Sequence, residues 1–186
     1  GKQPYKIASL GLGRTFQNIR LFKDLTVLDN VLIAFSNHHK QHVLASFLRL
    51  PAFYKNEEEL KSKALDLLKI FDLDSDADTL AKNLAYGQQR RLEIVRALAT
   101  EPKILFLDEP AAGMNPQETA ELTELIRRIK DEFKITIMLI EHDMNLVMEV
   151  TERIYVLEYG RLIAQGTPDE IKTNKRVIEA YLGGEA

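Results

Sequence analysis

The sequence predicts an α/β protein, in which a largely parallel sheet with helices on both faces is joined to a part that is mostly helical. Two observations support this fold class. From residue 87 onwards, short apolar segments alternate with amphipathic helical segments, whereas residues 17–86 show mainly helical periodicity. Short, fully apolar strands that alternate with helices are typical of a parallel sheet that is buried on both faces.

The first part of the chain contains one predicted strand and two predicted helices. The strand covers residues 12–17 and follows a glycine pair. A helix is predicted over residues 25–35, where Thr26 and Asp29 have the spacing of a capping box. A second helix is predicted over residues 56–71, after a mixed segment that contains Pro51. Its apolar residues form one stripe, namely Leu60, Ala64, Leu67, Leu68 and Phe71.

The rest of the chain predicts the alternating core. Helices are expected over residues 87–100, 117–133 and 143–151, and strands over residues 104–107, 135–140, 153–157 and 161–166. We therefore expect three regions within 1–186. They are a mostly helical subdomain over about 17–86, an α/β core over about 87–166, and C-terminal helices over 167–186.

Composition excludes several classes of protein. The net charge is −3, and the absence of a basic block argues against binding to nucleic acid. The chain contains no cysteine, so it forms no disulfide and has no thiolate chemistry. Its apolar runs are too short to cross a bilayer, and its first residues do not resemble a signal peptide.

Two patterns imitate metal sites. Alternate acids between residues 72 and 78 resemble a calcium loop, but Ala77 and Asn83 stand where that loop requires glycine and glutamate. We expect a solvated linker there. His38 and His42 lie one helical turn apart, a spacing that can chelate a metal, but a solvated polar face is the favoured interpretation.

The segment "ILFLDEP" brings two carboxylates, Asp108 and Glu109, to the end of an apolar strand. His142 follows the next predicted strand, and Gly87 opens a helix whose free N–H groups can bind phosphate. The carboxyl ends of parallel strands form the ligand crevice of an open α/β sheet. This combination suits metal-assisted phosphoryl transfer to water, in which one acid holds Mg²⁺ and the other activates the water. The alternative is a strand end and a histidine with structural roles only.

The ordered motifs "RTFQ", "LAYGQQRRLEIVRALA", "ILFLDEPAAGMNP" and "LIEHD" resemble the Q-loop, signature, Walker B with D-loop, and H-loop of ABC transporter ATP-binding subunits. The first two motifs, with "DEPAAGMNP" and the ending "VIEAYLG", are most similar to the branched-chain amino acid importers. The resemblance implies the P-loop NTPase-like fold of an ABC ATPase. It also implies ATP and Mg²⁺ as cofactors and ATP hydrolysis as the activity.

The resemblance assigns roles to residues around the strand ends. Asp108 would hold Mg²⁺, and Glu109 would be the general base. Gln17 would lie near the metal and the water and report to the membrane subunit. His142 would contact the γ-phosphate.

The signature residues would face ATP that is held by a second subunit; they are Ala85, Tyr86, Gly87 and Gln88. Ala85 stands where the wider superfamily has serine, Tyr86 where it has glycine, and Asn115 where the D-loop has aspartate. By the same resemblance, Asn115 is expected to contribute to the ATP site. All three departures occur in the importer branch. Phosphate contact at the signature is therefore expected to depend on backbone N–H groups.

The Walker A pattern G-x-x-x-x-G-K-[ST] is not present in these 186 residues, because only Gly1 is followed by lysine and Gln3 stands where serine or threonine is required. We therefore expect a partial nucleotide-binding domain that is inactive alone. The family fold would place the phosphate-loop strand between the strands at 135–140 and 153–157. Without that strand, open edges and an exposed apolar trough are expected.

The expected function is ATP hydrolysis coupled to import of branched-chain amino acids at the cytoplasmic face of the membrane. Expected partners are a second ATP-binding subunit, transmembrane permease subunits and, indirectly, a periplasmic or extracellular binding protein. The segment from Gln17 to about Phe71 is expected to contact the permease. Three alternatives remain open: a lipopolysaccharide-export-type ATPase, a soluble ABC ATPase acting on ribosomes or DNA, and a non-catalytic fragment.

Overall fold

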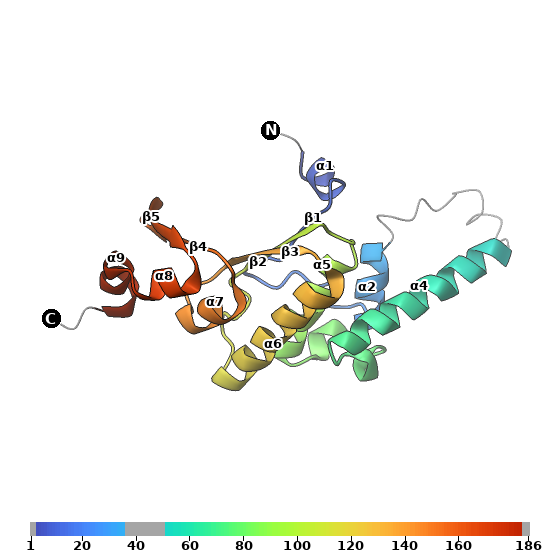
Figure 1. The fold of residues 1–186 in the computed structure, drawn as a ribbon. Coiled ribbons are helices and arrows are strands. Elements are labelled where there is room, and N and C mark those ends of the chain that lie inside the picture. The colour runs from blue at the N-terminus through green and yellow to red at the C-terminus, as the bar shows by residue number, and fades with distance from the viewer. Residues whose placement is uncertain (1–2, 36–50, 184–186) are drawn as a thin grey trace.

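A computed structural model describes residues 3–35 and 51–183 (Figure 1). The histidine pair His38 and His42, and most of the segment expected to contact a permease between residues 37 and 54, lie outside these ranges. No helix of the described ranges is both long enough and apolar enough to cross a membrane.

A parallel sheet occupies the centre of the molecule. Strands β1 (Leu12–Arg14), β2 (Ile104–Asp108) and β3 (Thr136–Ile140) are hydrogen-bonded in the order β1-β2-β3. Strands β4 (Ile154–Glu158) and β5 (Arg161–Gly166) form a separate antiparallel pair. The predicted α/β class is confirmed. The first strand is shorter than predicted, although the N–H of Thr15 still donates to the carbonyl of Phe106 at 2.9 Å.

Three helices lie along one side of this sheet, below the strands in Figure 1. They are α5 (Tyr86–Leu98), α6 (Pro116–Phe133) and α7 (Met144–Val150). The short helix α1 (Pro4–Ala8) lies above the strands in the same view. Leu105 and Leu107 of β2 are fully buried in the core that includes residues of these helices. Burial of alternate strand residues against amphipathic helices explains why the apolar β2 segment forms a central strand.

The helical part consists of α2 (Val27–Phe35) packed against α4 (Pro51–Ile70). Half of the predicted capping box forms, since the Thr26 hydroxyl accepts from the N–H of Asp29 at 3.0 Å. The Asp29 carboxylate accepts from the Thr26 hydroxyl, at 2.7 Å. The helix α4 begins five residues earlier than predicted, because Pro51 fits the first turn of a helix instead of ending it.

The acidic linker contains two short 3₁₀ turns, η1 (Asp74–Asp76) and η2 (Ala81–Asn83). Its acids are exposed at Asp72, Asp74 and Asp78, as predicted. Its apolar residues Leu73 and Ala81 are buried in the core, so the prediction of a solvated linker holds for these acids and is wrong for the apolar residues. The apolar side chains of this segment therefore pack into the core, while the three acids face solvent.

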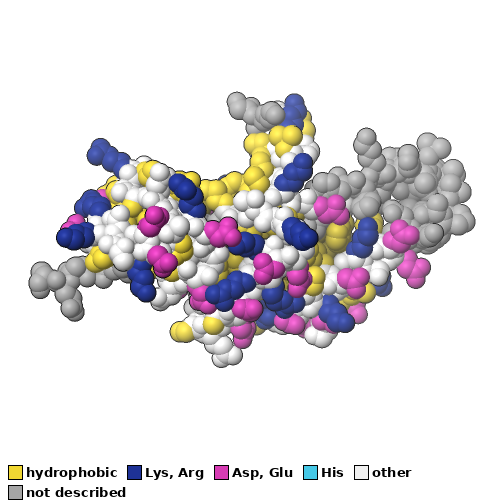
Figure 2. All heavy atoms as spheres, viewed as in Figure 1, with side chains coloured by type: hydrophobic (Ala, Val, Ile, Leu, Met, Phe, Trp, Pro, Cys, Tyr) yellow, Lys and Arg dark blue, Asp and Glu magenta, His cyan; other side chains and the backbone are white. Residues whose placement is uncertain are grey.

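One face of the strands remains open. Met138 and Ile140 of β3 are 50% and 49% exposed, and Tyr155 and Leu157 of β4 are 58% and 54% exposed. Hydrophobic side chains are also visible along the upper side of the molecule between β5 and α1 (Figure 2). In the described ranges β3 pairs only with β2, and β4 only with β5. The predicted open edges and exposed apolar surface are therefore present.

The chain continues after β5 into short helices. They are α8 (Pro168–Lys172), α9 (Lys175–Val177) and a π-helical turn η3 (Ile178–Gly183). Ile171 and Val177 pack with Ile154 and Val156 of β4 in a second apolar cluster. This small cluster covers one face of the β4–β5 pair.

Candidate functional site

The two acids lie at the carboxyl end of β2. Asp108 is the last residue of the strand, and its side chain is 23% exposed. Glu109 follows with a φ of 45°, and its N–H donates to the carbonyl of Ile140 at 2.9 Å. A glutamate in the left-handed region is uncommon, and such backbone strain is concentrated at functional sites. The β2–β3 pairing holds this turn in place.

Each acid has a partner from β1 or the segment after it. The Gln17 amide Nε2 donates to Glu109 Oε2 at 2.8 Å, and Arg14 Nη2 lies 2.9 Å from Asp108 Oδ2. The structure thus brings together three of the four predicted catalytic and metal residues. Arg14 was not among the predicted site residues, although its position three residues before Gln17 places it on the neighbouring strand.

The fourth predicted residue, His142, follows β3 at the same edge, because Asp108 and Ile140 are opposite each other in the register. The His142 side chain is 73% exposed. The preceding Glu141 has a side chain only 1% exposed, and it accepts from the N–H of Ala111 at 2.9 Å and of His142 at 3.2 Å.

Sequence reasoning missed Glu141. A polar residue directly after an apolar strand is the same signal that identified Asp108, and it could have identified Glu141 too. The Glu141 carboxylate joins the segment after β2 to the segment after β3, and so it fixes the loop that begins at Pro110.

The signature residues form the N-terminus of α5. Tyr86 is the first residue of the helix, one position earlier than predicted, and Ala85 is its N-cap. Alanine has no side-chain acceptor, so it cannot cap the first N–H groups as serine does. The Gln88 amide turns back instead, and its Oε1 accepts from the N–H of Ala85 at 3.1 Å. Its Nε2 donates to Asp76 Oδ2 at 2.9 Å, which ties the acidic linker to the signature.

Tyr86 and Gly87 determine how closely the signature approaches the segment after β2. The Tyr86 hydroxyl donates to the carbonyl of Ala112 at 2.9 Å. A Cβ added at Gly87 would lie 3.1 Å from Glu118 Oε1 of α6. Asn115 is the N-cap of α6, where its Oδ1 accepts from the N–H groups of residues 117 and 118 at 2.9 and 3.0 Å. The predicted site residues therefore form two groups, which the Tyr86–Ala112 hydrogen bond joins.

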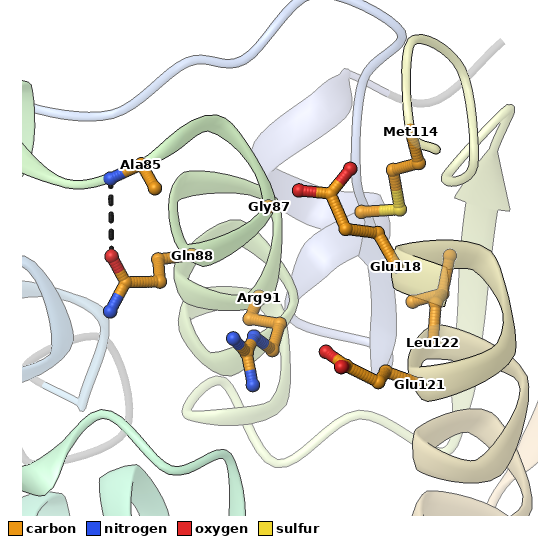
Figure 3. Close-up of a pocket in the computed structure, with 8 residues that line it drawn as sticks. All are labelled: Ala85, Gly87, Gln88, Arg91, Met114, Glu118, Glu121 and Leu122. Atoms are coloured by element: carbon orange, nitrogen blue, oxygen red, sulfur yellow. Dashed lines mark hydrogen bonds between the residues drawn. The ribbon is translucent and has the colours of Figure 1, made fainter. Parts of the chain in front are cut away.

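A hollow of about 100 Å³ lies between the beginnings of α5 and α6. Figure 3 shows Arg91 of α5 and Glu121 of α6 pointing into it, with Met114 and Leu122 as apolar walls. The hollow therefore combines one cation, acidic side chains and apolar surface beside the uncapped start of α5.

The oxygen atoms around β2 suit a hard cation. Mg²⁺ is usually held by one or two carboxylates together with substrate phosphates, and not by a complete protein cage. The groups that could contribute to such a partial set are the Asp108 carboxylate, whose Oδ2 is paired with Arg14 here, and the amide oxygen of Gln17. Among the residues that the structure describes, no cluster of three or more His, Cys, Asp or Glu side chains could hold a metal alone.

Comparison with known proteins agrees with this arrangement. Residues 2–112 match the ABC transporter family, and residues 161–186 match the family of branched-chain amino acid ATP-binding cassette transporters. The chain is 49% identical to the high-affinity branched-chain amino acid transport ATP-binding protein LivG of Salmonella typhimurium, over 96% of this chain and 70% of that protein. It is 48% identical to BraF of Pseudomonas aeruginosa, a protein with the same description, over 98% of this chain and 72% of that protein.

Solved structures show the same fold. A crystal structure of the ADP conformation of an ATP-binding cassette of an ABC transporter superposes with a TM-score of 0.77 and 32% identity, covering 98% of this chain and 72% of that one. A nucleotide-free ATP-binding cassette superposes with a TM-score of 0.74 and 30% identity, covering 97% of this chain and 72% of that one. The chain belongs to the ABC transporter ATP-binding subunits, a family of ATP hydrolases.

Proposed function

We propose that this chain belongs to the ATP-hydrolysing subunit of an ABC importer for branched-chain amino acids. Its similarity to LivG and BraF supports this assignment, and so does the match of residues 161–186 to a family of branched-chain amino acid cassettes. The single observation that most supports ATP hydrolysis is the hydrogen bond from the Gln17 amide to the carboxylate of Glu109, the residue directly after Asp108.

In this proposal Glu109 is the general base for the attacking water. The Gln17 amide fixes one carboxylate oxygen of Glu109 and leaves the other, Oε1, to accept a proton from water. Asp108 and the amide oxygen of Gln17 would hold Mg²⁺, which neutralises charge on the phosphates when it is bound. The exposed imidazole of His142, which follows the neighbouring strand β3, would contact the γ-phosphate.

The signature end of α5 would serve a different ATP molecule. Its first N–H groups and the positive end of the helix dipole favour an anion, and Ala85 leaves those groups without a side-chain cap. We propose that they face ATP held by a second ATP-binding subunit. The pair would bind transmembrane permease subunits at the cytoplasmic face of the membrane and respond, through them, to a substrate-binding protein.

Substitution of Glu109 by Gln in the subunit expressed from its full reading frame tests the proposed base. Glu109→Gln should lower the rate of ATP hydrolysis by about 10²–10⁴-fold and leave ATP affinity intact, because the amide can still bind Gln17 but cannot take a proton. Turnover and nucleotide affinity are measured separately. Glu124→Gln, an exposed change on α6, is the matched control. A normal rate in Glu109→Gln would show that Glu109 is not the base.

The transported substrate needs a second experiment. The subunit is reconstituted in proteoliposomes with its permease subunits and binding protein, and ATP hydrolysis is followed with and without leucine, isoleucine or valine. Stimulation by these amino acids is expected. Stimulation only by lipopolysaccharide components would favour the export-type alternative, and no hydrolysis in any mixture would favour a non-catalytic role.

A further inference from the structure

Three charged residues of helix α5 bind the segment that carries Gln17. Arg90, Glu93 and Arg96 are spaced three residues apart, so each side chain is a neighbour of the next along the helix surface. All three contact residues 16–22, more than seventy positions away in sequence. We propose that Arg90 and Glu93 are positioning residues for hydrolysis, which hold the main chain around Gln17 so that its amide stays on Glu109. This inference rests on the proposed function.

Arg90 provides the main contact. It is only 2% exposed, and its Nη1 donates to the carbonyl of Phe16 at 2.8 Å. Its Nη2 donates to the carbonyl of Gln17 itself. The planar guanidinium thus binds two consecutive carbonyls, a geometry that a lysine ammonium cannot reproduce because it is a point charge. Arg90 therefore fixes the peptide groups on both sides of the Gln17 α-carbon.

Glu93 and Arg96 extend the contact by one and two helical turns. Glu93 is 5% exposed; its Oε2 accepts from Arg90 at 3.2 Å, and its Oε1 accepts from the N–H of Arg20 at 3.3 Å. Arg96 Nη1 donates to the carbonyl of Arg20 at 2.5 Å, and its guanidinium lies 4.7 Å from the ring centroid of Phe22. Both ends of the segment are therefore held by the same helix.

Stabilisation of the fold alone does not account for the buried charges of Arg90 and Glu93 between α5 and the Gln17 segment. Burying an ion pair seldom stabilises a fold more than apolar residues of similar volume do. Here the charges meet the backbone of the catalytic segment, while the Arg90 guanidinium also lies 5.8 Å from the ring centroid of Tyr86 in the signature. One rigid helix therefore links the signature group of the site to the Gln17–Glu109 group.

The first test measures backbone protection and needs no nucleotide. Two variants are compared with the wild type by amide hydrogen exchange: Arg90→Lys, and the double variant Arg90→Met with Glu93→Leu. The double variant removes both members of the buried Arg90–Glu93 pair together, so neither is left as an unpaired buried charge, and Arg96 keeps its bond to the Arg20 carbonyl; it should remain folded even where a single change does not. In the double variant, the Arg20 amide should exchange on the order of 10-fold faster or more, because its acceptor is lost. Thr123→Val, which removes a buried hydroxyl on α6, is the control for general destabilisation.

The second test measures ATP hydrolysis by the subunit from its full reading frame. Arg90→Lys should lower kcat about 10-fold or more with little change in KM, since small misplacements of a catalytic group are costly. In a Gln17→Ala background, Arg90→Lys should cause no further loss, because it acts through Gln17.

Two results would overturn the inference: unchanged exchange at the Arg20 amide in the double variant, or rate losses that multiply in the Gln17→Ala background. A wild-type subunit without any ATP hydrolysis would instead refute the proposed function, and the exchange result would still decide whether α5 positions this segment.

Discussion

At the scale of single residues, three glutamates in and around the candidate site occupy conformations or positions that are unusual for glutamate. Glu109 occupies a left-handed conformation, and Glu141 and Glu93 are carboxylates in buried positions. The sequence predicted Asp108 and Glu109, because two acids directly after an apolar strand are conspicuous. It could not predict the role of Glu93, since a glutamate within an amphipathic helix is ordinary until the opposite segment is known.

Glu93 should make the stability of the protein depend on pH. Burial raises the pKa of Glu93 above its ordinary value of 4.5, despite the nearby Arg90 and Arg96 guanidinium groups. A raised pKa in the folded state means that the folded state holds the proton more tightly. The contribution of Glu93 to stability is therefore fully present below pH 4.5 and is lost as pH rises through the raised pKa.

Urea unfolding of the wild type and Glu93→Gln across this range measures the effect. The free energy of unfolding of the wild type should fall relative to that of the variant as pH rises from 4.5. Glu57→Gln, an exposed change on α4, should show no such trend relative to the wild type. A difference between the wild type and Glu93→Gln that is constant with pH would contradict the assignment.

At the scale of elements, periodicity predicted the helices and strands well, while their ends depended on local chemistry. The α4 stripe was visible in sequence, but the helix begins at Pro51, which was interpreted as a break. The strand β1 was predicted too long, because residues 15–17 are bound by β2 and α5 and do not continue a ladder. The linker between α4 and α5 was assigned from its acids, and its buried leucine and alanines were overlooked.

Asn115 provides a test at this scale, because it was expected near ATP and is found as the N-cap of α6. Asn115→Ala should lower the free energy of unfolding by about 1 kcal/mol, since two N–H groups lose their acceptor. Asn115→Asp should retain the stability, because a carboxylate can cap the same groups and interacts favourably with the helix dipole. Urea unfolding measures both. Asn145→Ala, an exposed change within α7, is the control, and an unchanged stability in Asn115→Ala would show that the cap is unimportant.

At the scale of the whole molecule, the described residues contain two apolar clusters, and apolar side chains are exposed on both β3 and β4. The larger cluster joins α2, α4, α5 and α6 beneath β2, while the smaller one lies under the β4–β5 pair. Exposed residues such as Met138 and Tyr155 lie on strands of two sheets that are not hydrogen-bonded to each other. The sequence predicted this openness only through the resemblance to a family, because strand order follows from long-range packing and not from local periodicity.

Residues 1–186 alone should show no appreciable specific affinity for Mg-ATP. These residues contain the signature, Asp108, Glu109, Gln17 and His142, but no G-x-x-x-x-G-K-[ST] pattern to surround the phosphates. The start of α5 contributes only about 0.3–1 kcal/mol towards an anion, whereas micromolar affinity requires about 8 kcal/mol. The carboxylates of Asp108 and Glu109 would repel a triphosphate that no phosphate-loop lysine neutralises.

Titration calorimetry with Mg-ATP measures this affinity directly. The control is a longer chain that carries a phosphate loop before Gly1; it should bind and hydrolyse ATP, and Mg-ATP should raise its Tm, since a ligand that binds only the folded state stabilises it. Micromolar binding by residues 1–186 would refute the prediction. It would mean that the signature side of the site, or the hollow between α5 and α6, holds phosphate without the loop, and that the division of the site between two subunits needs to be redrawn.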